Sequence, residues 1–580
     1  MFKRLLGCVR EYRRPTIVSL SFIVLEAIVE TFIPFITANL VNHVKAGAEV
    51  GAILATGGLL LVMAALSLTS GGVAGVACAR ASSGFAKNLR SDLYTKIGTY
   101  GFENIDKFST ASMVTRMTTD VQNVQMSYMV IIRTAIRAPL MLVFSMVMAF
   151  VMGGTLALAF VALVPLLTFG LIMIARFAMP AFRRVFRKYD RLNESIEENV
   201  RAARVVKGFS REGHEIEKFS QASENIRRDF TRAERIVACN APLMQVCLYA
   251  NMVFVLLIGS RLAIESRGTV IDVGQISAML TYGFQILMSL MMLSMIYVIL
   301  TMSSESIKRI GELLAEESAL TSPEGALTEV KDGSVVFSGV SFKYARDAEK
   351  YSLSDINLEI ASGMTVGVLG GTGSGKSTLV QLIPRLYDVS EGAVLVGGED
   401  VRRYDLDTLR NSVAMVLQKN QLFSGTIAEN LRWGNEQATL DELREACRLA
   451  SADSFIEAFP DGYETRIEQG GTNVSGGQKQ RLCIARALLK KPKILILDDS
   501  TSAVDTKTDA MIRAGLATYL PETTKIIIAQ RVASVMEADL ILLLENGRIA
   551  ARGNHEELLA ASSHYRELCE QQMGGVADAE

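Results

Sequence analysis

The chain contains 580 residues, which excludes a single ordinary domain and predicts two or more. Apolar residues make up 49% of the sequence and the mean hydropathy is +0.27, values that disfavour a wholly soluble protein. The formal net charge of −1 excludes the strong positive field typical of nucleic-acid-binding proteins, so no nucleic acid partner is expected. The seven cysteines follow no metal-ligand or disulfide spacing, which favours reduced thiols.

Long apolar stretches occupy about the first 300 residues. A transmembrane helix needs about 20 mostly apolar residues, and six stretches meet this requirement. They are residues 16–41, 53–78, 128–151, 153–177, 241–264 and 276–302. Basic residues precede the first stretch and no small-residue cleavage site follows it, which predicts a retained span and not a signal peptide.

Two long polar stretches, 79–127 and 178–240, separate these spans and are rich in arginine and lysine. The other connections are short and carry few positive charges, so the positive-inside rule places both long stretches and both termini in the cytoplasm. Apolar residues recur at near-helical spacing through 194–219, which predicts helical extensions of the spans and not disordered loops. The first half is therefore expected to be an all-α, six-helix, multi-pass domain in the cell (inner or cytoplasmic) membrane.

The charged residues inside the predicted spans include two pairs. Glu26 and Glu30 lie four apart in the first span, and Arg133 and Arg137 lie four apart in the third, so each pair shares one helical face. Charged side chains are costly inside a membrane. They either line a polar cavity for a charged or amphipathic substrate or form ion pairs between helices. The sequence leaves both interpretations open.

A glycine-rich loop follows the apolar run MTVGVL and precedes the helical pattern TLVQLIPRLY, which is the context of a phosphate-binding loop. Its glycines allow backbone N–H groups to converge on phosphate oxygens. Lys376 is expected to reach the β- and γ-phosphates of ATP, and Ser377 to bind Mg²⁺. The loop residues expected to bind ATP are Gly370, Gly371, Thr372, Gly373, Ser374, Gly375, Lys376, Ser377 and Thr378.

Two further motifs follow the phosphate loop. ILILDD (494–499) reads as an apolar strand that ends in two carboxylates, and Asp498 is expected beside Mg²⁺. NVSGGQ (473–478) opens an amphipathic helix pattern, which places glycine amides at a helix N-terminus, where they face an anion. The second half is therefore predicted to be an α/β phosphate-loop ATPase domain.

The phosphate loop, NVSGGQ and LILDD in this order resemble the ATP-binding-cassette (ABC) transporter superfamily. The six predicted spans with two long cytoplasmic stretches resemble its exporter-type (type IV) half-transporters, and the resemblance covers nearly the whole chain. It implies domain boundaries at 1–318 for the transmembrane domain, 319–332 for a linker and 333–580 for the nucleotide-binding domain. It also implies that two cassettes close around two ATP molecules and move the membrane helices through segments near 103–110 and 204–212.

The resemblance assigns roles to several residues outside the loop. Tyr344 is similar to the aromatic residue that stacks on adenine, and Gln418 to the glutamine that contacts Mg²⁺ and the attacking water. Asp505, in SAVD, is similar to an aspartate in a loop at the dimer interface. The residues matching the signature that binds the ATP of the opposite subunit are Ser475, Gly476, Gly477 and Gln478.

Two positions depart from the family pattern at the hydrolytic centre. Asp499 stands where the family usually has the glutamate that acts as general base, and it is shorter by one methylene group. Gln530 stands where the family has a histidine that contacts the γ-phosphate, and an amide cannot carry the charge of an imidazolium. Together the two changes predict a degenerate site with slow hydrolysis. Before the signature, EQGGTN (468–473) also replaces the usual GERG.

This pattern resembles the degenerate-site subunit of heterodimeric bacterial ABC exporters. The expected partners are a second, homologous half-transporter, the lipid bilayer and a small-molecule substrate. The expected activity is ATP-driven export of amphipathic compounds, of drug or lipid type. Two alternatives remain open: a siderophore-type importer with an exporter fold, and an ATP-gated channel or regulatory subunit.

Overall fold

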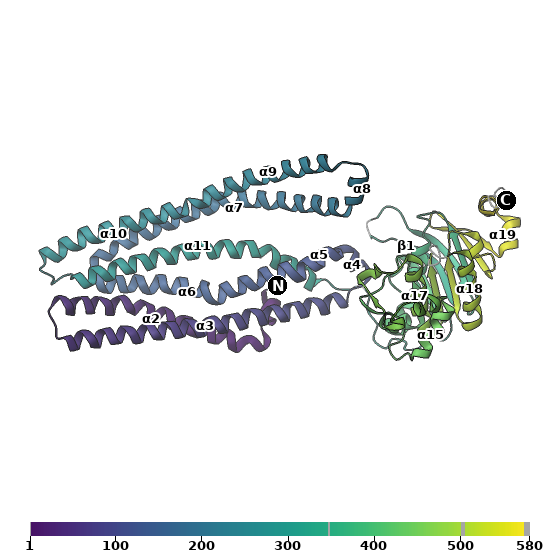
Figure 1. Ribbon diagram of the computed structural model, residues 1–580, viewed down its shortest axis with the longest axis horizontal. Helices are drawn as coiled ribbons and strands as arrows, with labels where there is room; N and C mark the ends of the chain where they lie inside the picture. Colours follow the sequence, from purple (N-terminus) through teal and green to yellow (C-terminus); the bar gives the residue numbers. More distant parts are fainter. Residues whose placement is uncertain (1, 319, 346–347, 500–504, 574–580) are drawn as a thin grey trace. The chain divides into compact units, whose positions relative to one another are not determined.

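The computed structural model describes residues 2–318, 320–345, 348–499 and 505–573 (Figure 1). They form two compact units. The helical unit comprises the chain up to Gly98 together with Ser109–Glu316. The nucleotide-binding unit comprises the chain from Glu317 on, and the short segment Thr99–Phe108 belongs to it as well.

Six helices of the helical unit contain the predicted spans, except that residues 153–157 of the fourth span precede its helix. They are α2 (Arg13–Lys45), α3 (Val50–Gly98), α6 (Val121–Gly153), α7 (Leu158–Arg201), α10 (Asn240–Glu265) and α11 (Val273–Ala315). In the described part of the chain, five helical stretches are long and apolar enough to cross a membrane. One of them, Thr110–Phe182, contains α6 and the first part of α7.

The tight connection between the third and fourth predicted spans is a single short turn. A 3₁₀ segment, Gly154–Ala157, joins α6 to α7. Gly154 has a φ of 51°, in the left-handed region that glycine adopts at little cost. The fourth helix therefore begins at Leu158, five residues later than the sequence predicted.

Further helices continue through the two polar stretches, as predicted. In the first stretch these are α4 (Phe102–Phe108) and α5 (Thr110–Thr115). In the second they are α8 (Ala203–Gly208) and α9 (Glu212–Ala238). The N-terminal residues add α1 (Phe2–Gly7) and a 3₁₀ turn, Arg10–Tyr12. Within the helical unit α2 packs along α3, α11 along α6, and α7 along α9 (Figure 1).

Ion pairs join the charged residues of the first and third spans. The Arg137 guanidinium lies 2.6 Å from the Glu30 carboxylate and 3.5 Å from the Glu26 carboxylate, so α6 is tied to α2. The ion-pair interpretation is thus confirmed for these three residues. Glu30 and Arg137 also border a hollow of about 440 Å³, so the cavity interpretation stays open for the same side chains.

A buried carboxylate ties α6 to α11 beyond the ends of the predicted spans. A π-helical turn, Arg116–Asp120, precedes α6 and ends at Asp120, which is fully buried. Arg309 donates two hydrogen bonds to the Asp120 carboxylate, of 2.5 and 2.9 Å. Ser306 donates a third, of 2.8 Å. The three bonds compensate the desolvation of the carboxylate and fix the register of the two helices.

Asp120→Ala is expected to lower the free energy of unfolding of the helical unit by about 2–4 kcal/mol, because three charge-assisted hydrogen bonds are lost together. Loss of helical circular dichroism on heating measures the effect. Glu265→Ala is the matched control, because it removes only the exposed pair between Arg261 and Glu265 and should cost about 0.5 kcal/mol or less. Equal midpoints for the two variants would contradict the assignment.

Two sheets form the scaffold of the nucleotide-binding unit. The larger has the order β12-β11-β3-β10-β9-β6, in which all neighbours from β11 to β6 are parallel and β12 is antiparallel. Its strands are β3 (Thr365–Gly370), β6 (Val413–Val416), β9 (Ile494–Asp498), β10 (Thr524–Ile528), β11 (Leu540–Glu545) and β12 (Arg548–Gly553). The parallel register pairs Ile528 with both Val368 and Asp498, so the carboxyl ends of β3, β9 and β10 meet at one edge.

The smaller sheet is antiparallel and has the order β2-β1-β4-β5. Its strands are β1 (Val335–Phe342), β2 (Leu353–Ile360), β4 (Glu391–Val396) and β5 (Glu399–Asp400). A two-stranded ribbon joins β7 (Gly425–Thr426) to β8 (Arg466–Ile467). The helices are α12 (Lys376–Gln381), α13 (Leu406–Ser412), α14 (Ile427–Arg432), α15 (Leu440–Leu449), α16 (Asp453–Glu457), α17 (Gly476–Leu489), α18 (Thr506–Tyr519), α19 (His555–Ala561) and α20 (Ser563–Met573). The predicted α/β phosphate-loop architecture is confirmed.

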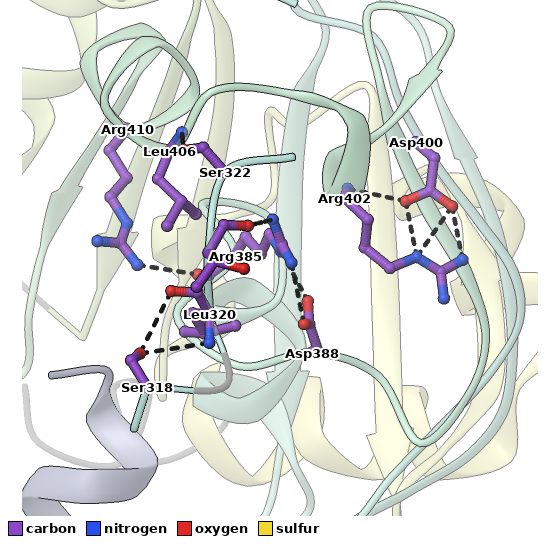
Figure 2. A network of polar contacts seen from close by, with 10 residues as sticks. Ser318, Leu320, Ser322, Arg385, Asp388, Asp400, Arg402, Leu406 and Arg410 are labelled. Atoms are coloured by element: carbon purple, nitrogen blue, oxygen red, sulfur yellow. Dashed lines mark hydrogen bonds and ion pairs between the residues drawn. The ribbon is translucent and has the colours of Figure 1, made fainter. Parts of the chain in front are cut away.

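The described residues of the predicted linker are attached to the nucleotide-binding unit (Figure 2). Arg385, which is buried, donates a hydrogen bond of 3.2 Å to the Thr321 carbonyl and is held by Asp388 at 2.7 Å. The Ser322 hydroxyl accepts a bond of 3.1 Å from the Leu406 backbone N–H. The sequence alone does not indicate this attachment, because the partners of the linker residues lie more than sixty positions away.

Candidate nucleotide-binding site

The glycine-rich loop lies between β3 and α12, at the sheet edge where β9 and β10 also end. Gly375 takes a φ of 99° at the start of α12, and a Cβ atom there would lie 2.9 Å from the Ser352 carbonyl oxygen. Glycine is therefore required by conformation and by space. The helix is shorter than the predicted pattern and ends at Gln381, because Pro384 cannot continue it.

Lys376 is held within the loop itself. Its ammonium donates hydrogen bonds of 2.8 Å to the carbonyl oxygens of both Gly370 and Gly371. Burial lowers the pKa of Lys376 from its ordinary value, while the nearby carboxylates of Asp498 and Asp499 oppose that shift. The cation thus lies at the mouth of the loop, in the position needed to meet phosphate oxygens.

Ser377 and Asp498 form an oxygen pair beside the loop. The Ser377 hydroxyl donates a hydrogen bond of 3.1 Å to the Asp498 carboxylate at the end of β9. Burial raises the pKa of Asp498 above its ordinary value, and the hydrogen bond from Ser377 opposes the shift. A hydroxyl and a buried carboxylate are the hard oxygen donors that suit Mg²⁺, so the residues fit this metal. The buried Ser374 hydroxyl has no hydrogen-bond partner among the described residues, which leaves a further donor in the loop.

The structure brings the three residues of the predicted hydrolytic centre together. Gln530 donates a hydrogen bond of 2.7 Å to the Asp499 carboxylate, and Gln418 donates a weaker one of 3.5 Å to the same oxygen. Asp499 has a φ of 49°, a left-handed conformation that aspartate tolerates better than most residues. The backbone carbonyl of Asp499 also accepts a bond of 3.4 Å from the buried Gln480. Sequence reasoning missed Gln480, since it lies inside α17 and follows the signature motif without belonging to it.

Tyr344 lies against the phosphate-loop helix. Its hydroxyl is 2.9 Å from the Thr378 hydroxyl and donates a bond of 3.2 Å to Gln381. Its ring packs edge-on against Tyr387 at a centroid distance of 5.2 Å. Tyr387 in turn donates a hydrogen bond of 2.8 Å to Asp106 of α4. No motif in the sequence indicates this contact, because it joins residues 281 positions apart.

The signature residues form a separate feature at the start of α17. Ser475 accepts a hydrogen bond of 3.2 Å from the Gln478 backbone, and the Gln478 side chain accepts one of 2.9 Å from the Ser475 backbone. This capping box explains why the predicted helix begins at Gly476. In the described part of the chain, no hydrogen bond joins Ser475–Gln478 to the phosphate loop. Of the SAVD sequence only Asp505 is described, where it caps α18; the other three residues lie outside the described ranges.

Comparisons with known proteins match both halves of the chain. Residues 16–303 match the family model described as the ABC transporter transmembrane region, and residues 353–502 match the one described as ABC transporter. A solved structure of a bacterial Atm1-family ABC exporter with ATP bound shares the fold. Its TM-score is 0.83 at 24% sequence identity, over 97% of this chain and 99% of that one.

Curated relatives match over most of the chain. An ABC transporter ATP-binding protein of Bacillus subtilis (strain 168), YfiB, is 34% identical over 557 residues, 96% of each protein. A fatty acid ABC transporter ATP-binding/permease protein of Mycobacterium bovis is 33% identical over 480 residues, 83% of this chain and 75% of that protein. The chain therefore belongs to the ABC transporters: it is a multi-pass membrane protein and transport ATPase, with a transmembrane region fused to its ATP-binding domain.

Proposed function

We propose that the chain is one half of a heterodimeric exporter of amphipathic small molecules, of drug or lipid type, and that its own ATP site hydrolyses slowly. The observation that carries this proposal is the hydrolytic centre, where Gln530 holds the short Asp499 side chain at 2.7 Å. Both residues differ from those usual in the family, and their side chains contact each other. The fatty acid transporter of Mycobacterium bovis, which is 33% identical, supports an amphipathic substrate.

Binding of ATP is assigned to the phosphate loop Gly370–Thr378 and to Tyr344. Lys376 and the loop N–H groups face the phosphates, and Tyr344 supplies the aromatic ring for adenine. Ser377, Gln418 and Asp498 would hold Mg²⁺, which neutralises charge on the phosphate oxygens when it is bound. ATP and Mg²⁺ are the cofactors of the proposal.

Slow hydrolysis follows from the position of the base. The Asp499 carboxylate is one methylene shorter than that of glutamate, so it stands back by about 1 Å from the place of the attacking water, and a misplacement of this size costs about 10²-fold in rate. Gln530 also donates a hydrogen bond of 2.7 Å to the Asp499 carboxylate, so one oxygen of the base already accepts a donor other than water. ATP should consequently remain bound here through several cycles.

The partner is proposed to be a homologous half-transporter with glutamate and histidine at the matching positions. Ser475, which is exposed at the start of α17, and Gly476–Gln478 would complete its ATP site. Both termini are assigned to the cytoplasmic side of the inner, or cytoplasmic, cell membrane. The segment Thr99–Phe108, from a stretch that links two spans, packs with the nucleotide-binding unit, which supports its role in coupling.

Reconstitution of the chain with such a partner in vesicles tests the proposal. The pair should couple ATP hydrolysis to uphill movement of an amphipathic dye out of the cytoplasmic side, whereas the chain alone should turn over ATP slowly. Movement in the opposite direction would favour an importer. Downhill flux without sustained hydrolysis would favour an ATP-gated channel. Rapid turnover by the chain alone would contradict the degenerate site.

A further inference from the structure

A second hollow of the helical unit lies between α7 and α11 and has a volume of about 570 Å³. This volume falls within the range of about 300–1,000 Å³ that is typical of sites for one small molecule. Most of its lining is apolar, including Leu171 and Met179 of α7 and Leu290 of α11. It shares no lining residue with the hollow that Glu30 and Arg137 border.

One charged side chain, Arg176, borders this hollow. Among the residues that the structure describes, no carboxylate pairs with its guanidinium and no acceptor is hydrogen-bonded to it. Arg137 of the same unit, by contrast, contacts two carboxylates. Arg176 is exposed, so its guanidinium is accessible to a ligand, and its positive charge makes the hollow suitable for an anion. The hydroxyl-bearing residues Ser294 and Tyr297 border the same hollow from α11.

The polar and apolar parts of the hollow lie at different depths. Arg176 lies about five helical turns from the start of α7, and Leu171 lies between three and four turns from the same start. With about 1.5 Å per residue, Arg176 lies about 27 Å from the start of the helix, close to the end of a hydrocarbon core of about 30 Å. Under the predicted topology this end is the cytoplasmic one. The hollow therefore has its cation at headgroup level and Leu171 within the inner leaflet.

We propose that this hollow binds a long-chain carboxylate, with its carboxylate on Arg176 and its hydrocarbon chain between Leu171 and Leu290. The inference rests on the proposed transport of amphipathic molecules and names their chemical class. A planar guanidinium fits a carboxylate with two parallel hydrogen bonds. Because the hollow has one cation, a singly charged headgroup is compensated, whereas a doubly charged one keeps an unpaired charge.

The binding test uses the purified full chain in phosphatidylcholine nanodiscs without ATP. The probe is hexadecanoic acid that carries a photoreactive diazirine, and hexadecanol with the same group is its neutral counterpart. Saturable crosslinking to α7 and α11, located by mass spectrometry, is expected for the acid. Arg176→Gln should raise the half-saturating concentration of the acid about tenfold or more and leave that of the alcohol unchanged, because one charge-assisted contact is lost.

Three further variants keep the result interpretable. Arg176→Lys retains the charge and should remain within a few-fold of the unmodified chain. Leu171→Trp fills the apolar part of the hollow and should weaken the binding of the acid and of the alcohol alike. Arg184→Gln removes another arginine of α7, outside the hollow, and should change neither.

The proposal is overturned if Arg176→Gln binds the acid as well as the unmodified chain does, since Arg176 then merely reaches the headgroup region. It is also overturned if the acid and the alcohol saturate alike. Binding is measured without ATP or partner, so its failure differs from a failure of transport. Intact binding with no ATP-driven movement would refute the proposed export and leave the site in place.

Discussion

Replacing Asp499 with glutamate and Gln530 with histidine is expected to raise steady-state ATP turnover by the purified chain about 100-fold. The added methylene moves the carboxylate about 1 Å toward the attacking water. The histidine removes the amide that now donates a hydrogen bond of 2.7 Å to the Asp499 carboxylate. Phosphate release in detergent or nanodiscs measures the change, because homodimers of the variant chain would contain both a repaired site and an intact signature.

Two control variants separate repair of the base from other effects. In the variant Asp499→Gln with Gln530→His, the side chain at position 499 has the length of glutamate without its charge. Its ATP turnover should stay as slow as that of the unmodified chain. Adding Lys376→Ala to the repaired double variant should abolish the gain. If the double variant itself stays slow, the defect lies elsewhere, and the EQGGTN segment (468–473) before the signature becomes the next place to test.

Lys376→Ala in the otherwise unmodified chain is expected to weaken ATP binding about 10- to 100-fold. The ammonium lies at the mouth of the phosphate loop, held by two carbonyl oxygens at 2.8 Å, and can pass to phosphate oxygens with little movement. Charge-assisted hydrogen bonds contribute about 1.5–3 kcal/mol, which corresponds to this range. Equilibrium titration with a fluorescent ATP analogue measures the affinity.

The matched control for this lysine is Lys491→Ala. Lys491 belongs to the same unit, and its ammonium lies 3.2 Å from the Glu442 carboxylate on the surface, so its loss should leave ATP affinity unchanged. An affinity of the Lys376→Ala variant equal to that of the control would show that the loop binds nucleotide by backbone contacts alone. The assignment of Lys376 to the phosphates would then be wrong.

Features that depend on local pattern could be predicted from the sequence. The helices that contain the six spans follow from the lengths of the apolar runs, and the α/β order of the second half follows from strand, loop and helix signals around Gly370. The proximity of Asp499 to Gln530 could also be anticipated, because both follow strands of one parallel sheet. The resemblance to ABC transporters then placed Gln418 beside them, and the hydrogen bond to Asp499 agrees with that placement.

Features that depend on distant side chains could not be predicted. Asp120 and Arg309 are 189 positions apart, and neither position carries a motif that singles it out. The attachment of the predicted linker through Arg385 and the contact of Tyr387 with Asp106 could not be predicted for the same reason, because each joins residues far apart in the sequence. The sequence places Glu30 and Arg137 in two different spans, but their pairing depends on the relative rotation of α2 and α6, which packing decides.

The cysteines of the chain have a practical consequence. All seven lie in the described ranges as free thiols; six are buried, and Cys239 is exposed at the junction of α9 and α10. A thiol-reactive fluorophore added under native conditions should therefore attach at this one junction, with no substitution and no cysteine-free background. The unmodified protein thus offers its own attachment point for distance measurements by resonance energy transfer while ATP binds and is released.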